Sequence, residues 1–89
     1  MVVYKYTIQP QEVNKIEVPR YCKVLSVKEQ RDEIVIYVLG DEKERREAML
    51  EVLVLPTGFA IAQNLVTYTF LDTVNLKDGA LMFHIFYKL

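Results

Sequence analysis

The 89-residue chain is 52% hydrophobic and 26% charged, a composition that excludes general disorder and is typical of one globular domain, residues 1–89. Its 11 basic and 12 acidic residues nearly cancel, so no overall field attracts nucleic acid or anionic lipid, and any anion site must be local. No apolar run approaches the roughly 18 residues of a membrane span, and the first residues lack the basic-then-apolar order of a signal peptide. We therefore expect a cytosolic protein, and the lone Cys22 is consistent with a reducing compartment.

The first third of the chain predicts three strands, because its apolar residues recur with a period of two. The first strand covers 2–8 and places Tyr4 and Lys5 on opposite faces. A short strand at 16–18 ends at a proline, and a third strand covers 22–30 with strict alternation of its two faces.

The middle of the chain predicts two more strands around a charged excursion. A turn at 31–33 precedes the run I-V-I-Y-V-L at 34–39, which is typical of a strand buried on both faces. The charged stretch 41–47 is too short for a stable helix, so we expect a solvated hairpin excursion, helical or not. A strand at 49–55 follows it.

The C-terminal part is interrupted by the break Pro56-Thr57-Gly58 between two apolar runs. This break is either a turn between strands or a loop whose free backbone amides meet an anion. Residues 65–74 predict a strand, 77–79 contain the D-G dipeptide of a tight hairpin turn, and 80–88 predict the last strand.

Six or seven strands with short links predict an all-β, mainly antiparallel domain. We expect a small sandwich or a compact barrel, with one short helix as an option. The sequence contains no repeat, linker or low-complexity segment.

Residues with catalytic potential are few. His84 is the only histidine, and a general base needs a partner, so a structural, hydrogen-bonded histidine is the simpler interpretation. Cys22 is either an activated thiol or, as we favour, a small core residue. One histidine and one cysteine make no metal cluster, and no phosphate-binding or nucleophile-elbow motif is present. We therefore predict no enzyme activity, no metal and no cofactor.

Candidate binding residues are more numerous. The loop at Thr57 and Gly58 offers donors without a side-chain anion, which suits phosphate or carboxylate, although a plain turn is the simpler interpretation. Arg45 and Arg46 can bind phosphate bidentately and Lys5 can act as a point charge, although an ordinary surface residue is the simpler interpretation of each. Six tyrosines and four phenylalanines supply rings for stacking on bases or for packing in a core or an interface.

Short strings that cover nearly the whole chain, in order and in spacing, resemble a family of small phage and prophage proteins. The strings are Lys5-Tyr6, Pro19, V-L-S-V-x-x-Q at 24–30 with Tyr37 seven residues on, Thr57-Gly58, F-L-D-T-V at 70–74 and G-A-L-M-F-H-I-F at 79–86. This chain departs from the family pattern at four positions. The family tends to have tryptophan at the position of Tyr37 and glycine at the position of Pro56. It tends to have histidine at the position of Phe59 and glycine at the position of Asp72. A ligand contact made by that histidine cannot be made by Phe59.

This family is similar to anti-CBASS sponge proteins, phage proteins that sequester the cyclic dinucleotides of bacterial anti-phage signalling. The resemblance implies a non-catalytic homo-oligomer, with a tetramer favoured, in the host bacterial cytoplasm. It would hold a cyclic dinucleotide such as cGAMP between subunits without cleaving it. A symmetric interface suits such a ligand, because its two phosphates and two bases have near two-fold symmetry. No DNA or RNA polymer and no membrane is expected as a partner.

From the resemblance and from residue chemistry we predict that the Thr57 loop donates to phosphate, a ring stacks on a base and cations neutralise charge. The predicted ligand-binding residues are Tyr4, Lys5, Arg45, Arg46, Thr57, Gly58, Phe59 and His84. One alternative is a phage protein–protein interaction module, a host-takeover or inhibitor protein with no small-molecule ligand, that uses its aromatic strand faces. A further alternative is a small hydrolase that uses His84.

Overall fold

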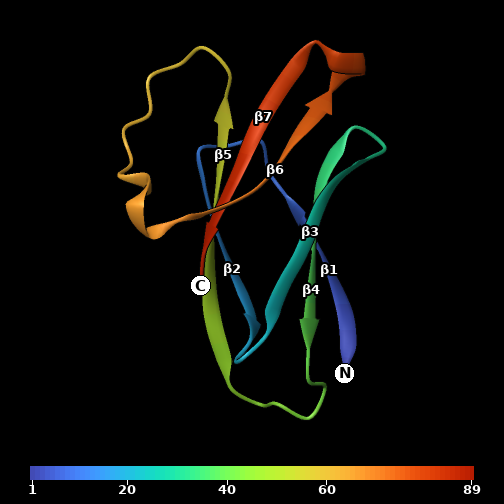
Figure 1. The fold of residues 1–89 in the computed structure, drawn as a ribbon. Helices are drawn as coiled ribbons and strands as arrows, with labels where there is room; N and C mark the ends of the chain where they lie inside the picture. The colour runs from blue at the N-terminus through green and yellow to red at the C-terminus, as the bar shows by residue number, and fades with distance from the viewer.

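The computed structural model describes residues 1–89 and consists of seven β-strands in two sheets (Figure 1). The first sheet has the order β1-β4-β3 and contains β1 (Val2–Ile8), β4 (Glu33–Gly40) and β3 (Lys23–Gln30). The second sheet has the order β2-β5-β7-β6 and contains β2 (Val13–Pro19), β5 (Glu47–Pro56), β7 (Leu81–Lys88) and β6 (Thr69–Leu76). Every strand pair is antiparallel, so the predicted all-β, mainly antiparallel class is confirmed.

The hydrophobic core lies between the two sheets. The central strand β4 contributes Ile34, Ile36 and Val38, which alternate along the strand and are buried. Strand β5 contributes Leu50, Val52 and Val54 from the other sheet, with the same alternation. Because the members come from both sheets, the domain is a sandwich, and its edge strands β3 and β6 also approach each other.

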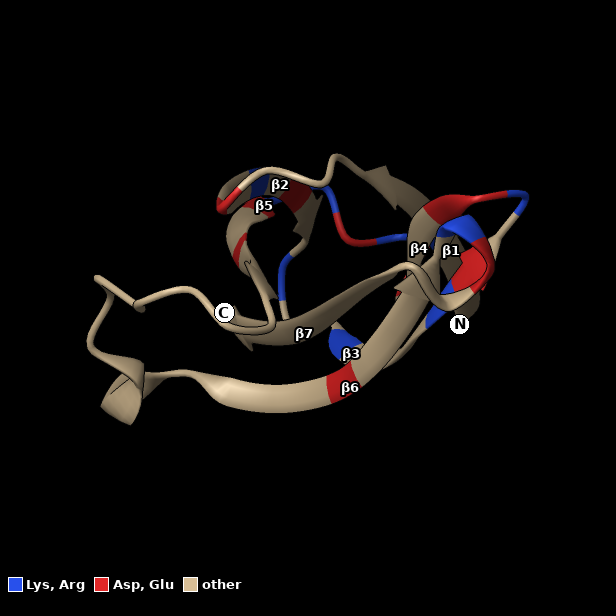
Figure 2. Ribbon diagram, turned by 90° about the horizontal axis from the view of Figure 1, so that it is seen from above, with Lys and Arg blue, Asp and Glu red and all other residues tan.

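The outer face of the second sheet, turned away from the first sheet, is also partly buried. Leu53 and Leu55 of β5 point to this face, yet only 0% and 3% of their surfaces are exposed. The 57–68 link leaves the end of β5 and runs on this outer side (Figures 1 and 2). At its far end, the Tyr68 hydroxyl donates a hydrogen bond to the Glu51 carboxylate on the same face.

The charged stretch 41–47 is solvated and contains no helix, but it is not a hairpin as predicted. Its two flanking strands belong to different sheets, since β4 pairs with β1 and β3, whereas β5 pairs with β2 and β7. The stretch therefore carries the chain across the end of the sandwich.

The predicted strand at 65–74 is wrong in its first part. Leu65–Thr67 forms a single 3₁₀ turn, and β6 begins only at Thr69. The turn is capped by Asn64, whose side chain accepts a hydrogen bond from the Val66 amide at 3.1 Å. The strict alternation predicted for 22–30 also fails, because a bulge at Leu25 turns both Val24 and Val27 inward.

Asn14 is the one polar residue buried in the sandwich, and it closes the connection between β1 and β2. Its Oδ1 accepts from the Gln9 amide at 3.1 Å, and its Nδ2 donates to the Gln9 and Gln11 carbonyls at 3.1 and 3.2 Å. We expect Asn14→Ala to lower the free energy of unfolding in urea by about 2 kcal/mol, because it leaves these backbone groups unpaired. Gln11→Ala, which removes one exposed hydrogen bond to the Val13 carbonyl, is the matched control and should cost less than about 0.5 kcal/mol. Equal losses for the two variants would contradict this role of Asn14.

Candidate functional site

Two of the predicted site residues, Thr57 and His84, are in direct contact. Strand β7 places His84 on the outer face of the second sheet, between Leu55 of β5 and Thr73 of β6. Thr57 follows β5 directly, and its amide donates to the Met82 carbonyl at 3.2 Å. This bond holds the Thr57 hydroxyl 2.7 Å from His84 Nε2, although the two residues are 27 positions apart in the chain.

The backbone after Thr57 presents unused donors. The amides of Gly58 and Phe59 take no part in backbone hydrogen bonds, since the strand has ended. Gly58 has a φ of 89°, and a Cβ there would meet nothing within 4 Å. Glycine is therefore required for its backbone conformation and not for space.

Phe59 is the exposed ring of this region, with 73% of its surface accessible. It borders two neighbouring pockets of about 300 and 270 Å³, both of which also include Pro56 and Phe83. Thr57 lines the second pocket. A flat apolar ring beside hydroxyl and amide donors is an arrangement that can hold an aromatic group carrying an anion.

No charged residue lies in the 57–68 link, whereas acidic and basic residues crowd the crossing at 41–47 (Figure 2). The cations predicted for the site are not beside it. Arg45 and Arg46 lie before the start of β5 and Thr57 lies after its end, a separation of roughly 30 Å for a strand of ten residues. Lys5 is exposed on the outer side of the first sheet, opposite Tyr37.

Tyr4 lies at the Arg45 end of the sandwich and is half-buried. Its ring edge is 3.1 Å from the position a Cβ would take on Gly40, so the ring packs against the backbone there. Together with Arg45 and Arg46, Tyr4 lines a separate pocket of about 360 Å³. A single chain therefore divides the predicted site residues between its two ends, with Lys5 apart on the outer side of the first sheet.

Arg46 is already engaged by a carboxylate. Its Nε lies 2.7 Å from Glu44 Oε1, and its Nη2 lies 3.0 Å from Glu44 Oε2. These hydrogen bonds from Arg46 lower the pKa of Glu44 to about 2, so the pair persists through the neutral and mildly acidic range. Arg45 and Lys43, the other two cations of this stretch, form no ion pair.

Tyr21 is an exposed residue that no sequence pattern singles out. It has a φ of 63°, unusual for a bulky side chain, and 73% of its surface is accessible. The guanidinium carbons of Arg20 and Arg46 lie 5.2 and 5.3 Å from its ring centroid. The turn after β2 places Tyr21 beside Arg20, and the backbone hydrogen bond from the Arg20 amide to the Arg46 carbonyl at 2.9 Å brings Arg46 to the same place.

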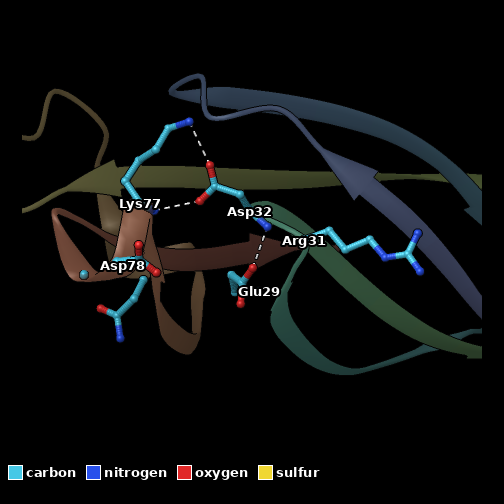
Figure 3. A pocket seen from close by; sticks show the side chains of 7 residues that line it. Glu29, Arg31, Asp32, Lys77 and Asp78 are labelled. Atoms are coloured by element: carbon cyan, nitrogen blue, oxygen red, sulfur yellow. Dashed lines mark hydrogen bonds and ion pairs between the residues drawn. The ribbon is translucent and has the colours of Figure 1, made fainter.

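The largest pocket, about 670 Å³, lies between the two hairpin turns and is polar (Figure 3). Asp32 of the β3–β4 turn accepts from the Lys77 amide at 2.7 Å and pairs with Lys77 Nζ at 2.8 Å. The Asp32 amide in turn donates to Glu29 at 2.6 Å, while the Arg31 side chain points away (Figure 3). These polar groups satisfy one another and join the two sheets, so we assign this pocket to the fold.

Cys22 is buried, with 9% of its surface exposed, and burial raises the pKa of its thiol. No three His, Cys, Asp or Glu side chains gather closely enough to hold a metal ion. No helix has the length and apolar character needed to cross a membrane.

We expect the Cys22 thiol to react slowly with a disulfide reagent in the native protein, because it is both protonated and covered. The absorbance of released thionitrobenzoate at pH near 8 should rise at least tenfold more slowly in buffer than in urea. Equal rates in the two solutions would contradict a buried thiol.

Comparison with known proteins gives one match. Residues 1–89 match the family described as a domain of unknown function, DUF7352. No curated protein matches the chain, and no solved structure matches it. The match spans the whole sandwich, including the Thr57–His84 contact and the crossing at 41–47, and the chain therefore belongs to the DUF7352 family.

Proposed function

We propose that this protein is a phage sponge, which binds a cyclic dinucleotide without cleaving it and so keeps the messenger from its bacterial effector. The observation that carries the proposal is the Thr57–His84 contact. It presents a hydroxyl and two unused amides next to the exposed Phe59 ring. These are donors for a phosphate and a stacking surface for a base. The protein would act in the cytoplasm of the infected bacterium.

The separation of the predicted residues supports binding between copies of the chain. One end offers neutral donors and a ring, and the other end offers the unpaired Arg45, in a pocket lined by two tyrosines, two arginines and four glutamates. Each pocket beside Phe59 is at the lower limit of ligand-site volumes, which is small for a molecule with two bases and two phosphates. A homo-oligomer, with a tetramer favoured, can place two copies of the Thr57 end around a two-fold symmetric guest.

The affinity such a protein needs is attainable with these groups. A nanomolar dissociation constant corresponds to about −12 kcal/mol. Each stacked base contributes about 1–3 kcal/mol, and charge-assisted bonds to phosphate are about twice as strong as neutral hydrogen bonds. Two chains supplying both terms can reach this range after the entropy of association is subtracted.

The Thr57–His84 pair also meets the first requirement for catalysis, a hydroxyl within hydrogen-bond distance of a base. The other ring nitrogen contacts the Thr73 hydroxyl at 2.9 Å, where a catalytic triad has a carboxylate. Loss of the ionised carboxylate from a triad lowers kcat by about 10⁴. For this reason we favour binding over hydrolysis.

A protein–protein interaction module is the second candidate, and the Arg20–Tyr21–Arg46 cluster is the observation that favours it. Tyrosine and arginine are enriched at the energetic centres of protein interfaces. In that case, protection of an infecting phage should be lost with Tyr21→Ala and kept with Thr57→Val.

We expect calorimetry with 3′,3′-cGAMP to give a nanomolar dissociation constant. Thr57→Val should raise this constant at least tenfold, because it removes the hydroxyl donor; the loss of binding free energy is about 1.4 kcal/mol. Thr67→Val changes an exposed threonine in the same link and is the matched control, with a change below about twofold. Chromatography after heat denaturation should return the ligand intact. Absence of heat with every cyclic dinucleotide, or loss of the ligand, would refute the sponge function.

A further inference from the structure

Both ring nitrogens of His84 are hydrogen-bonded to threonine hydroxyls. Nε2 lies 2.7 Å from Thr57 Oγ1, and Nδ1 lies 2.9 Å from Thr73 Oγ1. The three residues come from β7, β6 and the end of β5, so the contact joins three segments of the second sheet. A neutral imidazole has one donor nitrogen and one acceptor nitrogen, which means that the two hydroxyls play different roles.

The turn of the β6–β7 hairpin sets the pairing of Thr73 with His84. From Leu76 opposite Leu81, the register runs without interruption to Thr73 opposite His84 and Asp72 opposite Ile85. The bulge at Leu71 comes after this stretch and shifts only the pairing of Phe70 and Thr69. The Asp72 carboxylate accepts from the Thr73 amide at 2.8 Å, and the ring receives a hydroxyl at Nδ1.

The two tautomers of His84 give Thr57 opposite properties. With the proton on Nδ1, the ring donates to Thr73, and Nε2 accepts the Thr57 proton, so Thr57 offers only lone pairs to a ligand. With the proton on Nε2, the ring donates to Thr57 Oγ1, and the Thr57 proton is free to point outward. Only the second arrangement can donate to an anion, and it requires Thr73 to donate to Nδ1.

We propose that Thr73 is a positioning residue, whose hydroxyl donates to His84 Nδ1, holds the ring as the Nε2–H tautomer and thereby makes Thr57 a donor to the bound phosphate. This inference rests on the proposed function at Thr57. Thr73 itself is half-buried. We call this chain of hydrogen bonds from Thr73 through His84 to Thr57 the relay. It fixes the direction in which the Thr57 hydroxyl donates, whereas the hydroxyl of an unbonded threonine rotates freely.

The test combines binding with a spectroscopic signature of the ring. In protein labelled with ¹⁵N-histidine and bound to 3′,3′-cGAMP at pH near 8, His84 Nε2 should have the ¹⁵N shift of a protonated nitrogen. Nδ1 should have that of an acceptor. Thr73→Val should raise the dissociation constant about fivefold to tenfold and move the Nδ1 shift to that of an unbonded nitrogen. Thr73→Ser keeps the hydroxyl, so its dissociation constant should lie within about twofold of the wild-type value and its Nδ1 shift should match that of the wild type. Thr69→Val changes an exposed threonine on the same strand and is the matched control.

The outcomes separate the relay from the sponge function. If the wild-type protein binds with the proton on Nδ1, or if Thr73→Val binds as tightly as the wild type, the relay is wrong and the sponge function stands. If the wild-type protein binds no cyclic dinucleotide, both are withdrawn. Unfolding in urea establishes that Thr73→Val is folded, and the tautomer of the ring in the wild-type complex supplies the answer if it is not.

Discussion

The apolar character of both faces of β5 is the constraint on which the position of the site depends. One face enters the core between the sheets, and Leu53 and Leu55 on the other face are also withdrawn from water. Burial of each such side chain contributes about 1.5–3 kcal/mol, a large share of the stability of a small domain. The 57–68 link lies on this face, held by Thr57 at one end and Tyr68 at the other. The contact between Thr57 and His84 is thus part of the same arrangement that covers β5.

The charged crossing at 41–47 and the start of the 57–68 link lie at opposite ends of β5. The link over the outer face carries no charge, while the crossing at 41–47 between the sheets carries paired and unpaired ions. Neutral donors hold a phosphate through directed hydrogen bonds, whereas a free guanidinium attracts it over a longer range. Because the two kinds of group lie at opposite ends of one chain, a ligand that needs both must meet more than one copy. The proposed oligomer is the arrangement that would bring both kinds of group to one ligand.

Much of the fold could be predicted from the sequence, because strands leave a period-two pattern and hairpin turns have their own chemistry. The run at 34–39 became the central strand β4, and the D-G dipeptide lies in the turn between β6 and β7. The predictions failed where one local contact overrides the pattern, as in the Asn64-capped turn at 65–67. The site was predicted in part: Thr57 and His84 were singled out separately, but their contact depends on strand order. Thr73 and Tyr21 were missed, since register and turn geometry give them their partners.

The register of the β6–β7 hairpin shows how little separates binding from catalysis on this sheet. A shift of one residue in that register would bring Asp72 opposite His84, and a carboxylate on Nδ1 stabilises the imidazolium that a general base forms. The observed register places a hydroxyl there, which can donate a proton to Nδ1 as well as accept one. A carboxylate would fix the proton on Nδ1 and leave Nε2 to accept from Thr57, whereas a hydroxyl permits the reverse direction. The same three side-chain positions therefore suit proton abstraction in one register and anion binding in the other, and β6 has the register that suits binding.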